Sequence, residues 1–155
     1  MILLDTDHIS VLQHADSAAA EALRGRLRHS ADRDIGTTAI TLEEQSRSWL
    51  ALINRYVSAR QQVGYYDRFV AMFRFFAEWR VAPFDDAAAA KLQELRSVRV
   101  RIGTNDLKIA SICLVNDATL LSRNAGDFSR VPGLRVENWL GHSVVTSAET
   151  EKPGE

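Results

Sequence analysis

Short apolar segments alternate with helical patterns along the chain, and this alternation constrains the fold more than any other feature. The candidate strands are residues 2–4, 35–40, 81–84, 118–122 and 134–136. Apolar residues recur at helical spacing between them, in residues 8–13, 17–27, 41–57, 65–79, 85–95 and 106–115. Strands joined by helical connections run parallel and are covered by helices. The pattern therefore predicts an α/β fold with a mostly parallel sheet covered on both faces.

The 155 residues suffice for one domain, and no internal repeat or linker divides them. We expect a single domain over residues 1–142 and a polar, frayed tail over residues 143–155. The N-terminal segment lacks basic residues and reaches Asp5 after four residues, so we expect no signal peptide. No apolar run approaches the ~20 residues of a membrane span. The single cysteine, Cys113, excludes an internal disulfide. We therefore expect a cytoplasmic protein without a membrane partner.

Positive and negative charges nearly balance. Nineteen basic residues face twenty acidic ones, and the formal net charge is −1. The balance excludes nucleic-acid binding through overall positive charge, so such binding would need a local basic face. Arginine supplies most of the positive charge. Its abundance has two explanations, phosphate recognition by the guanidinium group or a GC-rich coding bias.

Acidic residues stand close to the ends of the expected strands. They are Asp5 and Asp7 after the first strand, Glu43 and Glu44 after the second, Asp106 at the start of the helix before the fourth, and Asp127 after the fourth. The carboxyl ends of parallel strands meet at the edge of the sheet where ligands bind. Acids from four regions of the chain are therefore expected to converge at one place.

Convergence of these acids favours a bound metal ion. Two like charges about 4 Å apart repel by roughly 4 kcal/mol at an effective dielectric constant of 20. A protein relieves such repulsion by protonating some of the acids or by binding a cation. The donors are oxygens without a cysteine or histidine cluster, which favours Mg²⁺ or Mn²⁺ over Zn²⁺.

Each acid except Asp5 also has an explanation that needs no metal. Thr41 and Glu44 match a capping box at the start of a helix. Asp106 is favoured in a first helical turn by the helix dipole, and Asp127 could belong to a turn. Asp5 ends a buried strand, where a carboxylate loses hydration without an obvious partner.

Five segments of the sequence together carry a family resemblance. They are Leu3–Asp7 with Ser10, Ile40–Glu44, Gly103–Leu107 followed by Ile109 and Ala110, Leu121–Phe128, and Val131–Trp139. In this order they resemble the PIN-domain family, and above all the VapC-type toxins of bacterial toxin–antitoxin pairs. The resemblance runs from residue 2 to about residue 140. It implies a three-layer α/β/α sandwich and a Mg²⁺- or Mn²⁺-dependent endoribonuclease that hydrolyses RNA phosphodiester bonds.

The resemblance also assigns roles to residues. Position by position, it implies that Asp5, Glu44, Asp106 and Asp127 bind the metal and form the catalytic site. Asn124 stands where many relatives carry an acid, so Asp127 takes the fourth place here. Asp7 occupies a position that is often asparagine and is an extra metal ligand or supports one. The residues implied to orient water or phosphate are Thr6, Ser10, Ser122, Asn124 and Arg123.

Partners follow from the same resemblance. Family members commonly form homodimers and are bound by an antitoxin near the acidic groove. The aromatic segment at residues 65–79 is a candidate for either surface, and ordinary core packing is the alternative explanation of its rings.

Two other functions compete with this interpretation. Asp5 and Asp7 at a strand end also resemble the nucleophile and acid–base pair of haloacid-dehalogenase-type phosphatases. That chemistry requires a lysine, for which Lys91 and Lys108 are the candidates, and a later acidic pair. The second alternative is a non-catalytic PIN protein that only binds RNA or regulates a partner.

Overall fold

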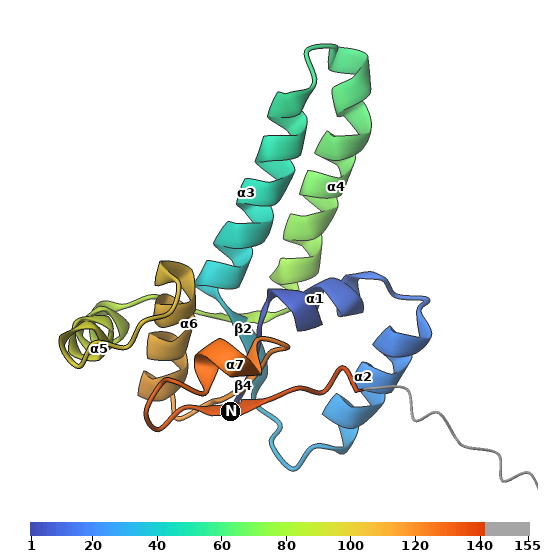
Figure 1. Ribbon diagram of the computed structural model, residues 1–155. Helices are drawn as coiled ribbons and strands as arrows, with labels where there is room; N and C mark the ends of the chain where they lie inside the picture. Colours follow the sequence, from blue (N-terminus) through green and yellow to red (C-terminus); the bar gives the residue numbers. More distant parts are fainter. Residues whose placement is uncertain (142–155) are drawn as a thin grey trace, which may run out of the picture.

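A wholly parallel five-stranded sheet lies at the centre of the computed structural model, which describes residues 1–141 (Figure 1). Its strands are β1 (Ile2–Leu4), β2 (Ile35–Thr38), β3 (Arg80–Ala82), β4 (Thr119–Leu121) and β5 (Arg135–Glu137), in the order β3-β2-β1-β4-β5. This arrangement confirms the predicted α/β fold with its parallel sheet. The predicted tail at residues 143–155 lies outside the described residues.

Seven helices within residues 1–141 connect and cover the strands. They are α1 (Thr6–Gln13), α2 (Ala18–His29), α3 (Ala39–Arg55), α4 (Ala59–Ala77), α5 (Asp86–Ser97), α6 (Thr104–Val115) and α7 (Ala125–Phe128). Short polar side chains accept hydrogen bonds from the first-turn N–H groups of several helices, as Asp5 does for α1, Ser17 for α2 and Asp85 for α5. None of the helices in this part of the chain has the length and apolar character needed to span a membrane.

Two hydrophobic cores lie on the two faces of the sheet. Leu3 and Leu120 face the first core, which contains the apolar sides of α5 and α6. Ile2, Leu4 and Leu121 face the second, against α1, α2 and α4. Successive strand residues point to opposite faces, so both faces of β1 are buried. The result is the predicted three-layer α/β/α sandwich.

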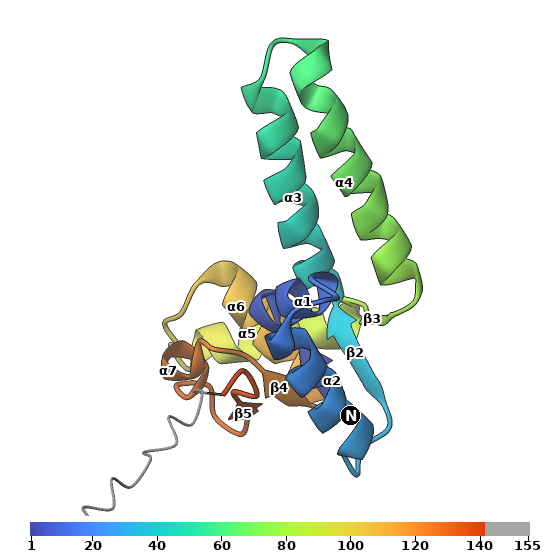
Figure 2. The same ribbon diagram turned by 90° about the vertical axis from the view of Figure 1, so that its right-hand side faces the viewer.

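Helices α3 and α4 form an antiparallel hairpin that extends well beyond the sheet (Figures 1 and 2). The expected helix at residues 65–79 begins earlier, at Ala59. Phe76 is buried in the second core, whereas Phe73 is 47% exposed on another side of α4. Val57 falls at the end of the helical pattern predicted over residues 41–57. It lies instead in the exposed turn between the two helices.

The predicted boundary between the second strand and its following helix is wrong. The strand ends at Thr38 instead of residue 40, and α3 begins at Ala39. Thr38 is the N-cap, because its hydroxyl accepts the backbone N–H of Thr41 at 3.1 Å. Glu44 is therefore one turn inside the helix, and the capping-box explanation for it is excluded.

Parallel register brings three chain segments to the same edge of the sheet. Leu4 pairs with Thr37 on one side and with Leu121 on the other. The residues that follow, including Asp5 and Ser122, must therefore emerge side by side. The backbone N–H of Asp5 donates to the Leu121 carbonyl at 2.9 Å, which extends this alignment by one residue.

Candidate active site

Asp5 is a buried carboxylate at the centre of this edge. It lies between the end of β1 and the start of α1 and is only 8% exposed. One oxygen accepts the Thr6 backbone N–H at 2.7 Å, and the other accepts the Ser122 hydroxyl at 2.7 Å. Burial raises the pKa of Asp5 to about 6. The two hydrogen bonds oppose this shift, and nearby carboxylates, including Glu44, reinforce it.

Glu44 joins this edge from α3. One carboxylate oxygen accepts the hydroxyl of Thr6 at 2.6 Å. The other accepts the side-chain amide of Asn105, at the start of α6, at 3.1 Å. Glu44 is thus held by two helices that are distant from it in sequence. The contacts of Glu44 with Thr6 and Asn105, and not a capping box, therefore account for its position.

Asp106 and Asp127 meet around Asn124. The Asn124 side-chain amide lies 3.4 Å from one Asp106 oxygen and 3.2 Å from one Asp127 oxygen. Burial raises the pKa of Asp106, and the negative charges of Glu44 and Asp127 raise it further. This mutual effect requires the three acids to lie near one another. Asp127 belongs to the short helix α7, which the sequence analysis did not predict.

Asp7 accepts hydrogen bonds with both carboxylate oxygens and so stabilises the loop after β4. One oxygen accepts from Nδ1 of His8, and the other accepts the Arg123 backbone N–H at 2.8 Å. Burial acts to raise the pKa of Asp7, but the hydrogen bonds from His8 and Arg123 outweigh it and lower that pKa. With both oxygens occupied, Asp7 supports the loop after β4, which carries Ser122 and Asn124.

His8 and Asn105 are two residues of this site that the sequence analysis did not select. His8 is fully buried, and its Nε2 accepts the Trp139 backbone N–H at 3.1 Å while Nδ1 binds Asp7. A histidine beside an acid at a strand end, and an asparagine beside Asp106, were the available signals. Their hydrogen-bond partners, Trp139 and Glu44, lie 131 and 61 residues away in the chain, so no local sequence pattern indicates these contacts.

The remaining predicted residues have separate places. Ser122 donates to Asp5 and accepts the Asn124 backbone N–H at 3.0 Å. Ser10 donates to the Thr6 carbonyl at 2.7 Å and accepts from Gln45, so it links α1 to α3. Arg123 is fixed through its backbone, and its side chain is exposed.

The acids supply oxygen ligands of the kind that Mg²⁺ and Mn²⁺ prefer. Polar side chains now lie between them, with Asn124 between Asp106 and Asp127. Within residues 1–141, no three His, Cys, Asp or Glu side chains already form an arrangement that could hold a metal ion. The donor chemistry and the raised pKa values of Asp5 and Asp106 nevertheless fit a cation, because positive charge would relieve both burial and repulsion.

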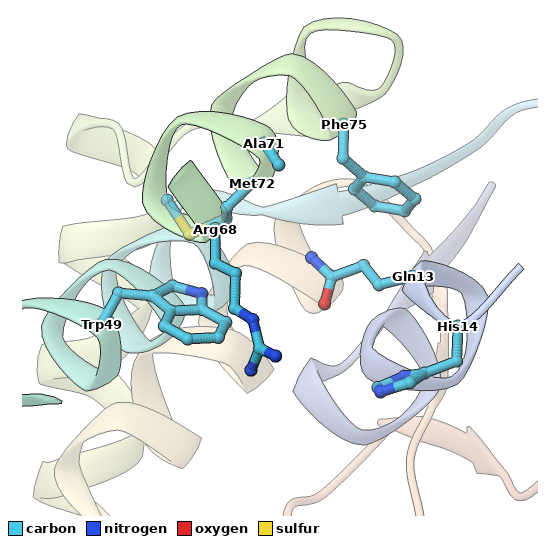
Figure 3. A pocket seen from close by; sticks show the side chains of 7 residues that line it. All are labelled: Gln13, His14, Trp49, Arg68, Ala71, Met72 and Phe75. Atoms are coloured by element: carbon cyan, nitrogen blue, oxygen red, sulfur yellow. The ribbon is translucent and has the colours of Figure 1, made fainter. Parts of the chain in front are cut away.

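A separate hollow of about 540 Å³ lies away from the acids, where the end of α1 faces the α3–α4 hairpin. Figure 3 shows Gln13 and His14 of the α1 end facing Trp49 of α3 and Arg68 of α4, with the ring of Phe75 of α4 next to Gln13. The lining combines aromatic and apolar surface with a cationic group. Such a surface can receive part of another protein.

Comparison with known proteins identifies the fold family. The PIN domain profile matches residues 2–134, which is most of the chain. The chain belongs to the PIN domain family. The predicted family resemblance is thereby confirmed.

The PIN domain also resembles individual proteins. A stretch of 46 residues is 46% identical to Ribonuclease VapC2 of Rickettsia felis. That stretch is 30% of this chain and spans about a third (34%) of the curated relative.

Three solved structures share the fold over most of the chain. VapBC2 of Rickettsia felis bound to a DNA fragment of its promoter gives a TM-score of 0.64 at 24% identity, covering 90% of this chain and 99% of that one. FitAcB of Neisseria gonorrhoeae gives a TM-score of 0.64 at 24% identity, covering 90% and 98%. VapBC-1 of nontypeable Haemophilus influenzae gives 0.67 at 20% identity, covering 91% and 100%.

The phosphatase alternative finds no support in this PIN domain. Lys91 pairs with Glu94 at 2.6 Å, and Lys108 lies over the ring of Phe84. Asp7, the acid–base group of that scheme, has both oxygens engaged by His8 and Arg123. The described residues therefore do not supply the lysine and the free acid that a phosphoaspartate mechanism requires.

Proposed function

We propose that this PIN domain is a Mg²⁺- or Mn²⁺-dependent endoribonuclease and the toxin of a toxin–antitoxin pair. One observation carries the proposal. Within residues 1–141, Asp5 is a buried acid without a cationic partner, at an edge where Glu44, Asp106 and Asp127 are also held. A fold gains no stability from a buried carboxylate whose pKa is raised to about 6, so a functional reason is needed. The similarity to Ribonuclease VapC2 supports RNA as the substrate.

The four acids would hold the metal. Asp5 and Asp106 would provide the main ligands, with Glu44 and Asp127 completing the site or serving a second ion. When bound, such an ion lowers the pKa of a coordinated water and stabilises charge on the phosphate in phosphodiester hydrolysis.

The surrounding residues keep the acids in place for this chemistry. Ser122 and the Thr6 backbone orient Asp5, whereas the Thr6 hydroxyl and Asn105 orient Glu44. Asn124 bridges the two remaining acids and must release them for a shared cation. These contacts fix most of the site before substrate arrives, which reduces the reorganisation needed during reaction.

Metal removal tests the proposal. A 5′-labelled single-stranded RNA should be cut at internal positions with Mg²⁺ or Mn²⁺, and cleavage should stop when EDTA is in excess. Calorimetric titration with Mn²⁺ should show binding that Asp106→Asn weakens. Hydrolysis of p-nitrophenyl phosphate in place of RNA would support the phosphatase alternative. The absence of both Mn²⁺ binding and cleavage would support the non-catalytic one.

The hollow between α1 and the α3–α4 hairpin is the place where the antitoxin would bind. Its lining combines the rings of Trp49 and Phe75 with the guanidinium group of Arg68 (Figure 3). An amphipathic helix with acidic residues on its rim would complement this surface. The similar structures of VapBC toxin–antitoxin complexes support a partner of this kind.

Filling this hollow should separate cleavage from neutralisation. Ala71 lines it, so Ala71→Arg should leave RNA cleavage in place but prevent rescue of growth by the antitoxin of the neighbouring gene. Gln61→Arg, at the exposed start of α4, provides the matched control and should be rescued normally. Equal rescue of both variants would place the antitoxin elsewhere.

A homodimer is also part of the proposal. Val63, Tyr66, Val70 and Phe73 expose apolar surface on α4. Burial of such a surface against a second copy would be favourable. Light scattering at micromolar concentration should give the mass of a dimer. The mass of a monomer would contradict the proposed homodimer.

A further inference from the structure

We propose that the RNA strand crosses the acidic edge between two cationic flanks, with Arg101 and Arg130 on one side and Arg123 on the other. This inference rests on the proposed ribonuclease function and adds the substrate path. The chain has a net charge of −1, so RNA must be bound through a local group of cations. The path of the RNA then depends on which exposed arginines lie beside the acids.

The first flank combines the loop before α6 with the segment after α7. One guanidinium nitrogen of Arg130 lies 3.4 Å from the Arg101 carbonyl oxygen and 3.9 Å from a carboxylate oxygen of Asp127. The Arg130 side chain is 64% exposed, and Arg101 is exposed as well. Within residues 1–141, Arg101 forms no ion pair. Arg130 therefore borders Asp127, the main chain of Arg101 lies beside Arg130, and both arginine side chains are exposed to an approaching phosphate.

The second flank is Arg123, on the opposite end of the same segment. Its backbone N–H is fixed by Asp7 at 2.8 Å, while its exposed side chain forms no ion pair among the described residues. Arg123 borders a hollow of about 400 Å³ that Val11, His14 and Ala19 also line, together with the polar residues Asp7, Ser10 and Ser17. An apolar floor with an imidazole and a guanidinium group suits the stacking of an unpaired base.

The order of residues in this segment defines the path. Arg123 and Arg130 enclose Asn124 and Asp127, and Asn124 contacts Asp106 across the site. Arg123 is held at Asp7 and Arg130 lies beside Asp127, so a strand whose reacting phosphate reaches the acids would pass a cation at each of these two places. The adjoining phosphates would meet Arg123 and the Arg101–Arg130 pair, and one neighbouring base would enter the hollow beside Arg123.

RNA binding without cleavage provides the test. The Asp5→Asn background should retain the strand, so fluorescence anisotropy with a labelled single-stranded RNA dodecamer measures Kd directly. Arg101→Gln, Arg123→Gln and Arg130→Gln should each raise Kd three- to tenfold. Each should also reduce the slope of log affinity against log salt by about 0.7, the value for one phosphate contact on a single strand. Arg60→Gln, at the remote tip of the hairpin, should change neither quantity.

One further variant, a stability control and one competitor distinguish the possible outcomes. Arg130→Lys should restore most of the salt slope, because it keeps the charge. Melting temperatures should match those of Arg60→Gln. If the wild-type protein cleaves RNA but the three glutamine variants bind it as Arg60→Gln does, the path is wrong and the ribonuclease proposal stands. If they weaken binding of polyglutamate but not of RNA, the flanks serve an acidic protein and the path is again wrong. RNA binding with these slopes and no wild-type cleavage would support the path and contradict the nuclease.

Discussion

Asp5→Asn is expected to reduce RNA cleavage roughly a hundred- to a thousandfold, the scale for loss of one group that stabilises charge in a transition state. The substitution keeps the shape of the side chain. An asparagine oxygen can still accept the Thr6 N–H, and the amide can donate to the Ser122 hydroxyl. The negative charge needed to hold a cation is lost. Initial rates with saturating Mg²⁺ or Mn²⁺ measure the effect.

The exposed acid Asp67 on α4 supplies the matched control. Asp67→Asn makes the same chemical change far from the acidic edge and should cleave RNA at the wild-type rate. Circular dichroism should show that both variants fold. Wild-type cleavage by a folded Asp5→Asn protein would remove Asp5 from the active site and, with it, the proposed metal centre.

The second large effect is a pH dependence of stability in the metal-free protein. The pKa of Asp5 rises from 3.8 to about 6 on folding, so the folded state binds its proton more tightly than the unfolded state. The stabilisation is therefore fully present below about pH 4 and is lost as the pH rises through 6. At 1.36 kcal/mol per pKa unit, the loss reaches at most about 3 kcal/mol.

Urea denaturation in EDTA between pH 4 and 7.5 measures this effect. Other carboxylates titrate in the same range, among them Asp7, whose lowered pKa acts in the opposite direction. The quantity to follow is therefore the difference in unfolding free energy between wild type and Asp5→Asn. The wild type should lose up to about 3 kcal/mol relative to the variant as the pH rises. Mn²⁺ at pH 7.5 should restore it, whereas a pH-independent difference would show that Asp5 is not a strained buried acid.

Much of the fold could be predicted because its signals are local. The apolar residues of β1 and β4 and the nearly all-apolar helix α6 are buried as the sequence indicates. An element boundary was predicted wrongly where one apolar run continues from a strand into the helix that follows it. Ala39 and Ile40 extend the apolar run of β2, but they form the first turn of α3 because Thr38 caps it. The helix α7 is four residues long, too short for a periodic signal.

The candidate site was only partly predictable. The positions of Asp5 and Glu44 near strand ends could be predicted, and Asp106 was added by the family resemblance, whereas parallel register accounts only for Asp5 and Ser122 lying side by side. The contacts that orient them could not be read from local sequence. Asn105 reaches Glu44, and His8 joins Asp7 to Trp139, through tertiary packing alone.

The strand order determines when a growing chain can form its acidic edge during synthesis. Within residues 1–141, β1 is translated before the other strands and lies in the middle of the sheet, whereas its neighbour β4 follows β2 and β3 in the chain. The ring of His8 likewise cannot accept its hydrogen bond from the Trp139 backbone N–H until Trp139 has been translated. A nascent chain therefore cannot assemble its acidic edge until β4 and the segment up to Trp139 have emerged from the ribosome.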